Sequence, residues 1–151
     1  MQIREYIPED FSCLTKILHQ AVHNIPTDIY TYEQQNAWAP DSILKQNLHL
    51  TKTWVCLMDD TIAGFIDFIP SKGYINYLYT HPDYQRKGIA SLLYQKVETE
   101  AIRLQIEKLT VDASKVALPF FLHKGFTLER ENIVERKGVK MINFTVGKII
   151  V

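Results

Sequence analysis

The 151-residue sequence has no excess of charge of either sign. Lys plus Arg and Asp plus Glu number 17 each, so the formal net charge is zero, which argues against broad attraction to nucleic acid or to an anionic membrane. The sequence also has no apolar run of membrane-spanning length, and its first residues lack the charged-then-apolar design of a signal peptide. We therefore expect a cytoplasmic protein that binds neither nucleic acid nor a membrane.

Cysteine is scarce as well. Cys13 and Cys56 are the only two cysteines, and neither lies in a paired motif or beside a feature that would lower the pKa of its thiol. We expect two reduced, mostly buried thiols. His19 and His23 have the spacing of a zinc-binding helix, but Gln20 follows the first and no third ligand is evident, so we expect no metal.

Apolar residues are plentiful, at 46% of the chain, and their spacing alternates between strand and helix periods. No internal repeat, linker or low-complexity tract interrupts them, so we predict a single domain over 1–151 and leave a homodimer open. The predicted elements are a strand near 3–6, a helix over 11–25 capped by Asp10, short helices at 31–37 and 41–48, a hairpin turning at 59–60, a strand at 74–80, a long helix at 89–104, a strand at 108–113, a short helix within 115–125, and a hairpin around 137–138.

The order of these elements predicts a mixed α/β fold. A strand, a long helix and a second strand over 74–113 form a crossover, which usually joins parallel neighbours. The hairpins on either side are antiparallel. We therefore predict a central, mostly antiparallel sheet with one parallel strand-helix-strand crossover and helices on both faces.

The loop at the start of the long helix, "QRKGIAS" over 85–91, has the features of an anion site. A helix beginning near Gly88 directs its unpaired N–H groups and its positive dipole end at this loop. Gly88 and Ala90 leave room for a close approach to the backbone, and Arg86 and Lys87 add positive charge. These features suit a diphosphate. Alone, the pattern fits a solvated basic loop slightly better.

The context of the loop reverses that preference. The stretch "YINYLYTHPDYQRKGIASLLYQKVE" resembles the signature of the GNAT superfamily of acetyl-CoA-dependent N-acetyltransferases, in which an apolar strand precedes V-x-P-x-Y and Q/R-x-x-G-x-G/A. Downstream, "LTVDASKVALPFFLHKGF" resembles the family's next signature. The second half is most similar to bacterial YafP-like members. The positions that match are Leu78, Thr80, Pro82, Tyr84, Gln85, Gly88, Ala90, Gly125 and Phe126.

The resemblance implies a GNAT-type fold, acetyl-CoA as cosubstrate, and transfer of acetyl to a primary amine of a small molecule or peptide by direct attack in a ternary complex. Backbone N–H groups from Arg86 to Ala90 would hold the CoA diphosphate, and a bulge around Leu78 to Thr80 would open the strand to the pantetheine. The implied cofactor-binding residues are Leu78, Tyr79, Thr80, Gln85, Arg86, Lys87, Gly88, Ile89, Ala90, Ser91, Ser114 and Phe121. Among the candidate catalytic residues, the resemblance implies Leu78, whose N–H would polarise the thioester carbonyl. Tyr79 and Tyr77 are candidates of a different kind, as possible proton donors on the same strand.

Two positions depart from the family's pattern. Ser114 stands where Asn commonly contacts the pantetheine. Phe121 stands where Tyr commonly donates a proton to the departing thiolate, and phenylalanine has no proton to donate. A thiol of ordinary pKa, ~8.5, can leave as thiolate unaided but more slowly. The alternative donors are Tyr79, Tyr77, Tyr84 and His123, although for each residue taken alone a packing or surface role is favoured over a catalytic one.

The acceptor side is the least defined part of the sequence. Tyr30, Trp38 and Asn143 are the candidate substrate-binding residues, with packing as the alternative role. Two other functions stay open: a non-catalytic acyl-CoA-binding regulatory domain, which Phe121 allows, and transfer of a longer acyl group. A flavodoxin-like nucleotide binder is disfavoured by the consecutive hairpins.

Overall fold

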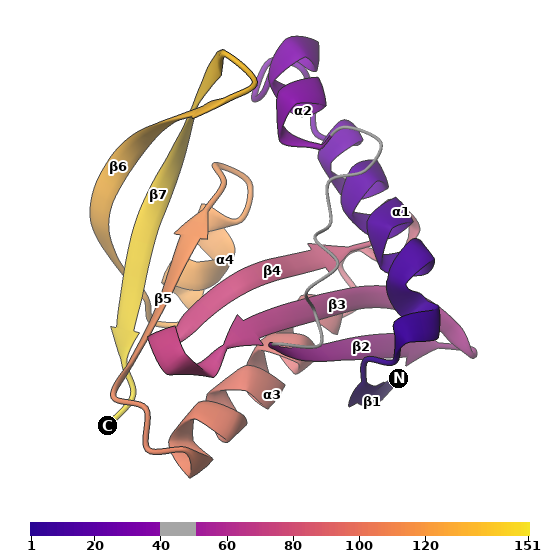
Figure 1. Ribbon diagram of the computed structural model, residues 1–151, viewed down its shortest axis with the longest axis vertical. Coiled ribbons are helices and arrows are strands. Elements are labelled where there is room, and N and C mark those ends of the chain that lie inside the picture. The colour runs from indigo at the N-terminus through magenta and orange to yellow at the C-terminus, as the bar shows by residue number, and fades with distance from the viewer. Residues whose placement is uncertain (40–50) are drawn as a thin grey trace.

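The computed structural model describes residues 1–39 and 51–151. The short helix predicted at 41–48 lies outside these ranges. The other predicted elements are confirmed within about three residues at their ends. They are β1 (Gln2–Glu5), α1 (Phe11–His23), α2 (Tyr32–Trp38), β2 (Lys52–Met58), β3 (Thr61–Ile69), β4 (Tyr74–Thr80), α3 (Ile89–Arg103), β5 (Lys108–Ala113), α4 (Leu118–His123), β6 (Thr127–Arg136) and β7 (Val139–Ile149), as Figure 1 shows.

The described strands form one seven-stranded sheet in the order β1-β2-β3-β4-β5-β7-β6. Every neighbouring pair is antiparallel except β4 and β5, which α3 connects and which run parallel. The predicted mixed sheet with one parallel crossover is therefore confirmed.

Helices cover both faces of the sheet, as predicted (Figure 1). Along β2, Trp54 and Cys56 belong to the core cluster under α3, while Val55 between them belongs to the cluster under α1. Ile66 and Phe65 of β3 divide in the same way. This alternation follows from the strand period of two, and it explains why β2 and β3 are apolar without interruption.

Asp10 is the N-cap residue of α1, but the predicted cap by its side chain is not formed. Its carboxylate instead accepts hydrogen bonds from the Arg4 guanidinium at 2.8 and 3.0 Å and from the Ile7 N–H at 3.0 Å. Burial of Asp10 opposes ionisation, yet these hydrogen bonds hold its pKa below the usual value. The residue therefore ties α1 to β1.

The strands β4 and β5 diverge soon after they meet (Figure 1). Between these two described strands, only two residue pairs form: Tyr74 pairs with Thr110, and Ile75 pairs with Val111. From Asn76 onward, the edge of β4 that faces β5 therefore has no strand partner. The divergence opens a gap in the sheet at the carboxyl ends of the two parallel strands, where ligands of open α/β sheets usually bind.

The bulge in β4 lies earlier than predicted. Asp67 of β3 faces Tyr77, but the next residue of β3 already faces Ile75, so Asn76 is the extra residue. The register of Leu78–Thr80 against β3 is regular, and the bulge predicted there is wrong.

Hydrogen bonding to a buried carboxylate accompanies this bulge. Asp67 is fully buried, and its carboxylate accepts hydrogen bonds from the Thr53 hydroxyl at 2.6 Å, from the Asn76 amide at 3.0 Å and from the Thr51 hydroxyl. A buried carboxylate needs such donors, and the extra residue brings one of them to it.

Candidate active site

A cavity of about 570 Å³ lies where β4 and β5 diverge, between the start of α3, the segment that leads into α4, and the end of α1. Of the residues that the resemblance implied for cofactor binding, only Lys87 lies outside its lining. The others all line it: Leu78, Tyr79, Thr80, Gln85, Arg86, Gly88, Ile89, Ala90, Ser91, Ser114 and Phe121.

The loop at 85–91 presents a row of unsatisfied backbone donors. Within the described chain, the N–H groups of residues 88–91 donate to no protein acceptor. The chain reaches this arrangement through left-handed conformations at Arg86 (φ 63°) and Gly88 (φ 83°). A β-carbon on Gly88 would meet no protein atom within 4 Å, so the glycine faces open space. Together with the positive end of the α3 dipole, these donors have the chemistry that suits an anion.

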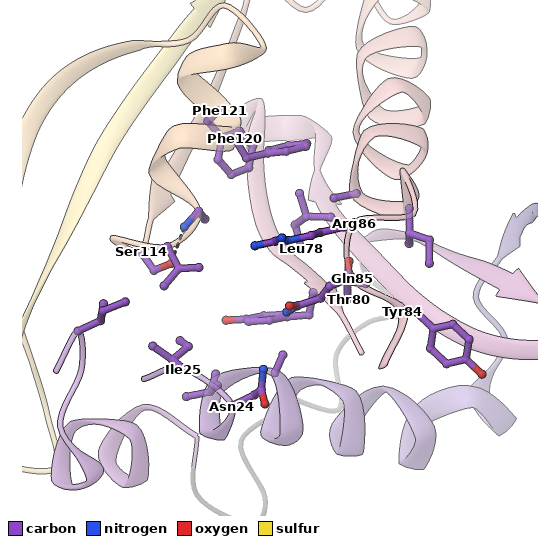
Figure 2. Close-up of a pocket in the computed structure, with 18 of the residues that line it drawn as sticks. Asn24, Ile25, Leu78, Thr80, Tyr84, Gln85, Arg86, Ser114, Phe120 and Phe121 are labelled. Carbon is purple, nitrogen blue, oxygen red and sulfur yellow. Dashed lines mark hydrogen bonds between the residues drawn. The ribbon is translucent and has the colours of Figure 1, made fainter. Parts of the chain in front are cut away.

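The opposite wall of the cavity comes from the end of α1, which sequence reasoning missed. Asn24 and Ile25 line the cavity and lie across from Phe120 and Phe121 (Figure 2). Nothing in the local sequence marks these two residues, because only the packing of α1 over the sheet brings them there.

The two departures from the family pattern both lie in this cavity. The Ser114 hydroxyl oxygen accepts a hydrogen bond from the Ala117 N–H at 3.1 Å, which leaves its proton available to a ligand. Phe121 is only 1% exposed, and its ring packs edge-on against Phe120 and Phe126 with centroids 5.2 Å away in each case. Phe121 therefore contributes an apolar wall while most of its ring lies in the core.

A second cavity of about 270 Å³ adjoins the first on the side of α1 and α2. It includes Tyr77 and the three predicted acceptor residues, Tyr30, Trp38 and Asn143. It also includes four polar residues that sequence reasoning missed, namely Tyr74, Asn76, Asp112 and Arg136. The two cavities share Trp38, Tyr79 and Ser114, so a molecule in one can meet a molecule in the other at these residues.

Tyr79 lies at this junction with its hydroxyl protonated. Burial raises the pKa of Tyr79 to about 12, while a hydrogen bond from the Trp38 side chain and the charge of Arg136 offset part of that rise. Tyr77 lies on the same face of β4, with ring centroids 6.3 Å apart, because the bulge precedes both residues. Tyr77 lines only the second cavity.

The other candidate residues are less well placed. Tyr84 is at the rim of the first cavity with its hydroxyl directed away from it (Figure 2). His123 is exposed and lines neither cavity. The Tyr30 hydroxyl donates to the Ile142 carbonyl at 2.6 Å and accepts from the Lys115 N–H at 2.9 Å, so it holds these segments together.

The two histidines of α1 and the two cysteines line neither cavity. His19 and His23 both contact the Ala39 carbonyl oxygen, at 3.1 and 2.9 Å, and in the described ranges no group of three His, Cys, Asp or Glu side chains is placed to hold a metal. Cys13 and Cys56 are free, and burial raises the pKa of both thiols. None of the helices over 1–39 and 51–151 is long and apolar enough to span a membrane.

The fold agrees with the comparisons to known proteins. The model of the Acetyltransferase (GNAT) domain matches residues 26–147, and the chain belongs to this family of N-acetyltransferases. It is 37% identical over 147 residues to the "Uncharacterized N-acetyltransferase YafP" of Escherichia coli (strain K12). The matched residues make up 95% of this chain and 93% of that protein. The predicted resemblance to GNAT enzymes and to YafP-like members is confirmed.

Two solved structures show the same fold. The "GCN5-Related N-acetyltransferase: Aminotransferase, Class-II" of Rhodopseudomonas palustris is 29% identical, with a TM-score of 0.91 over 98% of this chain and 94% of that one. The PaiA N-acetyltransferase of Thermoplasma acidophilum, solved in complex with coenzyme A, is 20% identical, with a TM-score of 0.80 over 98% of each chain.

Proposed function

We propose that this N-acetyltransferase binds acetyl-CoA in the 570 Å³ cavity and an amine in the adjoining cavity, and that the amine attacks the thioester directly in a ternary complex. The observation that supports the proposal is the row of unsatisfied N–H groups at 88–91, residues that line the larger cavity. Such donors at the start of a 15-residue helix suit a diphosphate, and CoA carries one.

The pantetheine would follow the gap between β4 and β5. The β4 edge from Asn76 onward lacks a strand partner there, so its backbone groups are available to an amide-containing arm. Leu78 lines the cavity, and its N–H is our candidate for polarising the thioester carbonyl as negative charge develops on the oxygen.

The reaction balances without a covalent enzyme intermediate. The acceptor ammonium loses a proton, its nitrogen forms a bond to the carbonyl carbon, and the carbon–sulfur bond breaks. A second proton leaves the nitrogen as the amide forms, and the CoA thiolate takes up one, so one proton is released to solvent overall.

Tyr79 is our candidate to assist the departing thiolate. Because its pKa is about 12, its hydroxyl holds its proton against a thiolate of ordinary pKa, ~8.5. We therefore propose that it stabilises the thiolate as a hydrogen-bond donor rather than by complete proton transfer. Phe121 contributes shape alone, since it has no proton to give.

A library of amines and short peptides, screened for release of free CoA from acetyl-CoA, tests this proposal. We expect turnover with at least one acceptor, and we expect turnover to fall when propionyl- or butyryl-CoA replaces acetyl-CoA. Calorimetry on the same protein measures CoA binding separately. Binding of acetyl-CoA without CoA release from any amine would indicate the non-catalytic domain, and faster turnover of longer acyl groups would indicate the other alternative.

We also propose a single catalytic domain over 1–151 in the cytoplasm, where the two free thiols would stay reduced. The homodimer stays a prediction, which light scattering on the purified protein tests.

A further inference from the structure

Two opposite charges line the smaller cavity, and the general transfer chemistry uses neither of them. Asp112 of β5 lines the smaller cavity, and it lies two residues before Ser114, which belongs to the junction of the two cavities. Arg136 is the last residue of β6 and lines the same cavity as Val134, two residues before it. The charges therefore reach one cavity from two different strands.

The Asp112 carboxylate is oriented by two hydroxyl groups. Tyr74 donates to one of its oxygens at 3.0 Å, and Thr145 donates to the other at 2.5 Å. Burial and the nearby Asp112 charge raise the pKa of Tyr74, which keeps that hydroxyl a donor. A carboxylate has about four acceptor positions, so two hydroxyls leave capacity for an ammonium. In the described part of the chain, no lysine or arginine forms an ion pair with Asp112.

Arg136 supplies the positive charge of the cavity. Burial raises the pKa values of Tyr74 and Tyr79, and the charge of Arg136 offsets a small part of both rises, because the guanidinium lies near these tyrosines. Within residues 1–39 and 51–151, no carboxylate lies within ion-pairing distance of it, Asp112 included. A guanidinium in this position can bind a carboxylate through two parallel hydrogen bonds.

We infer that the acceptor is a small amino-carboxylate, a free amino acid or an ω-amino acid, whose ammonium binds Asp112 and whose carboxylate binds Arg136. This inference rests on the proposed function. The size of the cavity supports it, because about 270 Å³ is below the roughly 300–1,000 Å³ of sites for drug-sized ligands. A peptide N-terminus fits less well, since its α-carboxyl is an uncharged amide.

Matched acceptors test the inference. The acceptors are the standard amino acids and ω-amino acids of three to six carbons, each paired with its carboxamide, together with alkylamines, diamines and dipeptides. Initial rates of CoA release at saturating acetyl-CoA give kcat and KM for wild type, Arg136→Gln, Asp112→Asn and Lys140→Gln. Lys140 is the control, a nearby cation of the same hairpin that lines neither cavity. Thermal unfolding shows whether each variant is folded.

We expect wild type to prefer at least one acid over its carboxamide. Arg136→Gln should raise KM for that acid roughly 10- to 100-fold, the effect of losing hydrogen bonds between charged groups, and leave KM for the carboxamide nearly unchanged. Asp112→Asn should raise KM for both members of the pair, and Lys140→Gln should change neither.

Several results would overturn the inference while leaving the proposed function intact. Wild type could use acid and carboxamide equally well, or turn over only alkylamines, diamines or dipeptides. Arg136→Gln could raise KM equally for acid and carboxamide, or Lys140→Gln could raise KM for the acid as much as Arg136→Gln does. CoA binding with no turnover of any amine would overturn the proposed function, and this inference with it.

Discussion

Gly88 offers the sharpest test of the anion site, because the chain contains a matched control. Gly88 (φ 83°) is the N-cap residue that precedes α3, and Gly138 (φ 78°) lies in the β6–β7 turn. At both positions the backbone is left-handed and a β-carbon would meet no protein atom within 4 Å. Replacing either glycine by glutamate therefore introduces similar backbone strain, but only one replacement brings charge and bulk to the 570 Å³ cavity.

The expected size of each effect follows from this geometry. A non-glycine residue in the left-handed region costs about 1–2 kcal/mol, so both variants should lose about that much unfolding free energy. For a chain of this length, 1 kcal/mol shifts Tm by roughly 2–4 °C. In Gly88→Glu, the loss of one or more hydrogen bonds to the diphosphate, at about 1.5–3 kcal/mol each, should weaken CoA binding by roughly 10- to 100-fold or more.

Calorimetric titration of CoA into wild type, Gly88→Glu and Gly138→Glu, with thermal unfolding of each, makes the comparison. Gly88→Ala separates the β-carbon from the added charge and should lose less affinity than Gly88→Glu. Unchanged CoA affinity in folded Gly88→Glu, or an equal loss in Gly138→Glu, would refute the assignment of the diphosphate to this loop.

Further predictions concern the cations and aromatic side chains of the site. Because Arg86 lines the cavity and Lys87 does not, Arg86→Gln should weaken CoA binding and its salt dependence more than Lys87→Gln, and titrations at several salt concentrations check this. Tyr79→Phe should lower kcat across neutral pH, where the wild-type hydroxyl is protonated; an unchanged pH–rate profile would remove Tyr79 from the mechanism. The raised pKa of Tyr79 means that its stabilising contribution is present below pH ~10 and lost as the pH rises through about 12, so the stabilities of wild type and Tyr79→Phe should converge over that range. Phe121→Tyr should give a small gain in kcat, largest below the thiol pKa, if departure of the thiolate limits the rate; no gain at any pH would show that this position lies away from the sulfur or that another step is limiting.

Local rules explain what could be predicted from the sequence. The turn, the small residues and the helix start in "QRKGIAS" are properties of neighbouring residues, and their geometry depends on backbone preferences over a few positions. The same holds for the helices and strands and for the parallel crossover, which chain length and handedness restrict. Tyr77 and Tyr79 share a face for a similar reason, since side chains alternate along a regular strand.

The tertiary structure decided the rest through contacts between distant segments. The bulge lies at Asn76 because the buried Asp67 of another strand needs its amide, and no property of β4 alone reveals this. Asp10 does not cap α1 because its carboxylate accepts hydrogen bonds from Arg4, which belongs to a different element, β1. Asp112 and Arg136 share a cavity only because β4 and β5 diverge after two residue pairs and the β6–β7 hairpin adds to the far side of β5. Contacts of this kind depend on the packing of whole strands, so they leave no short motif in the sequence.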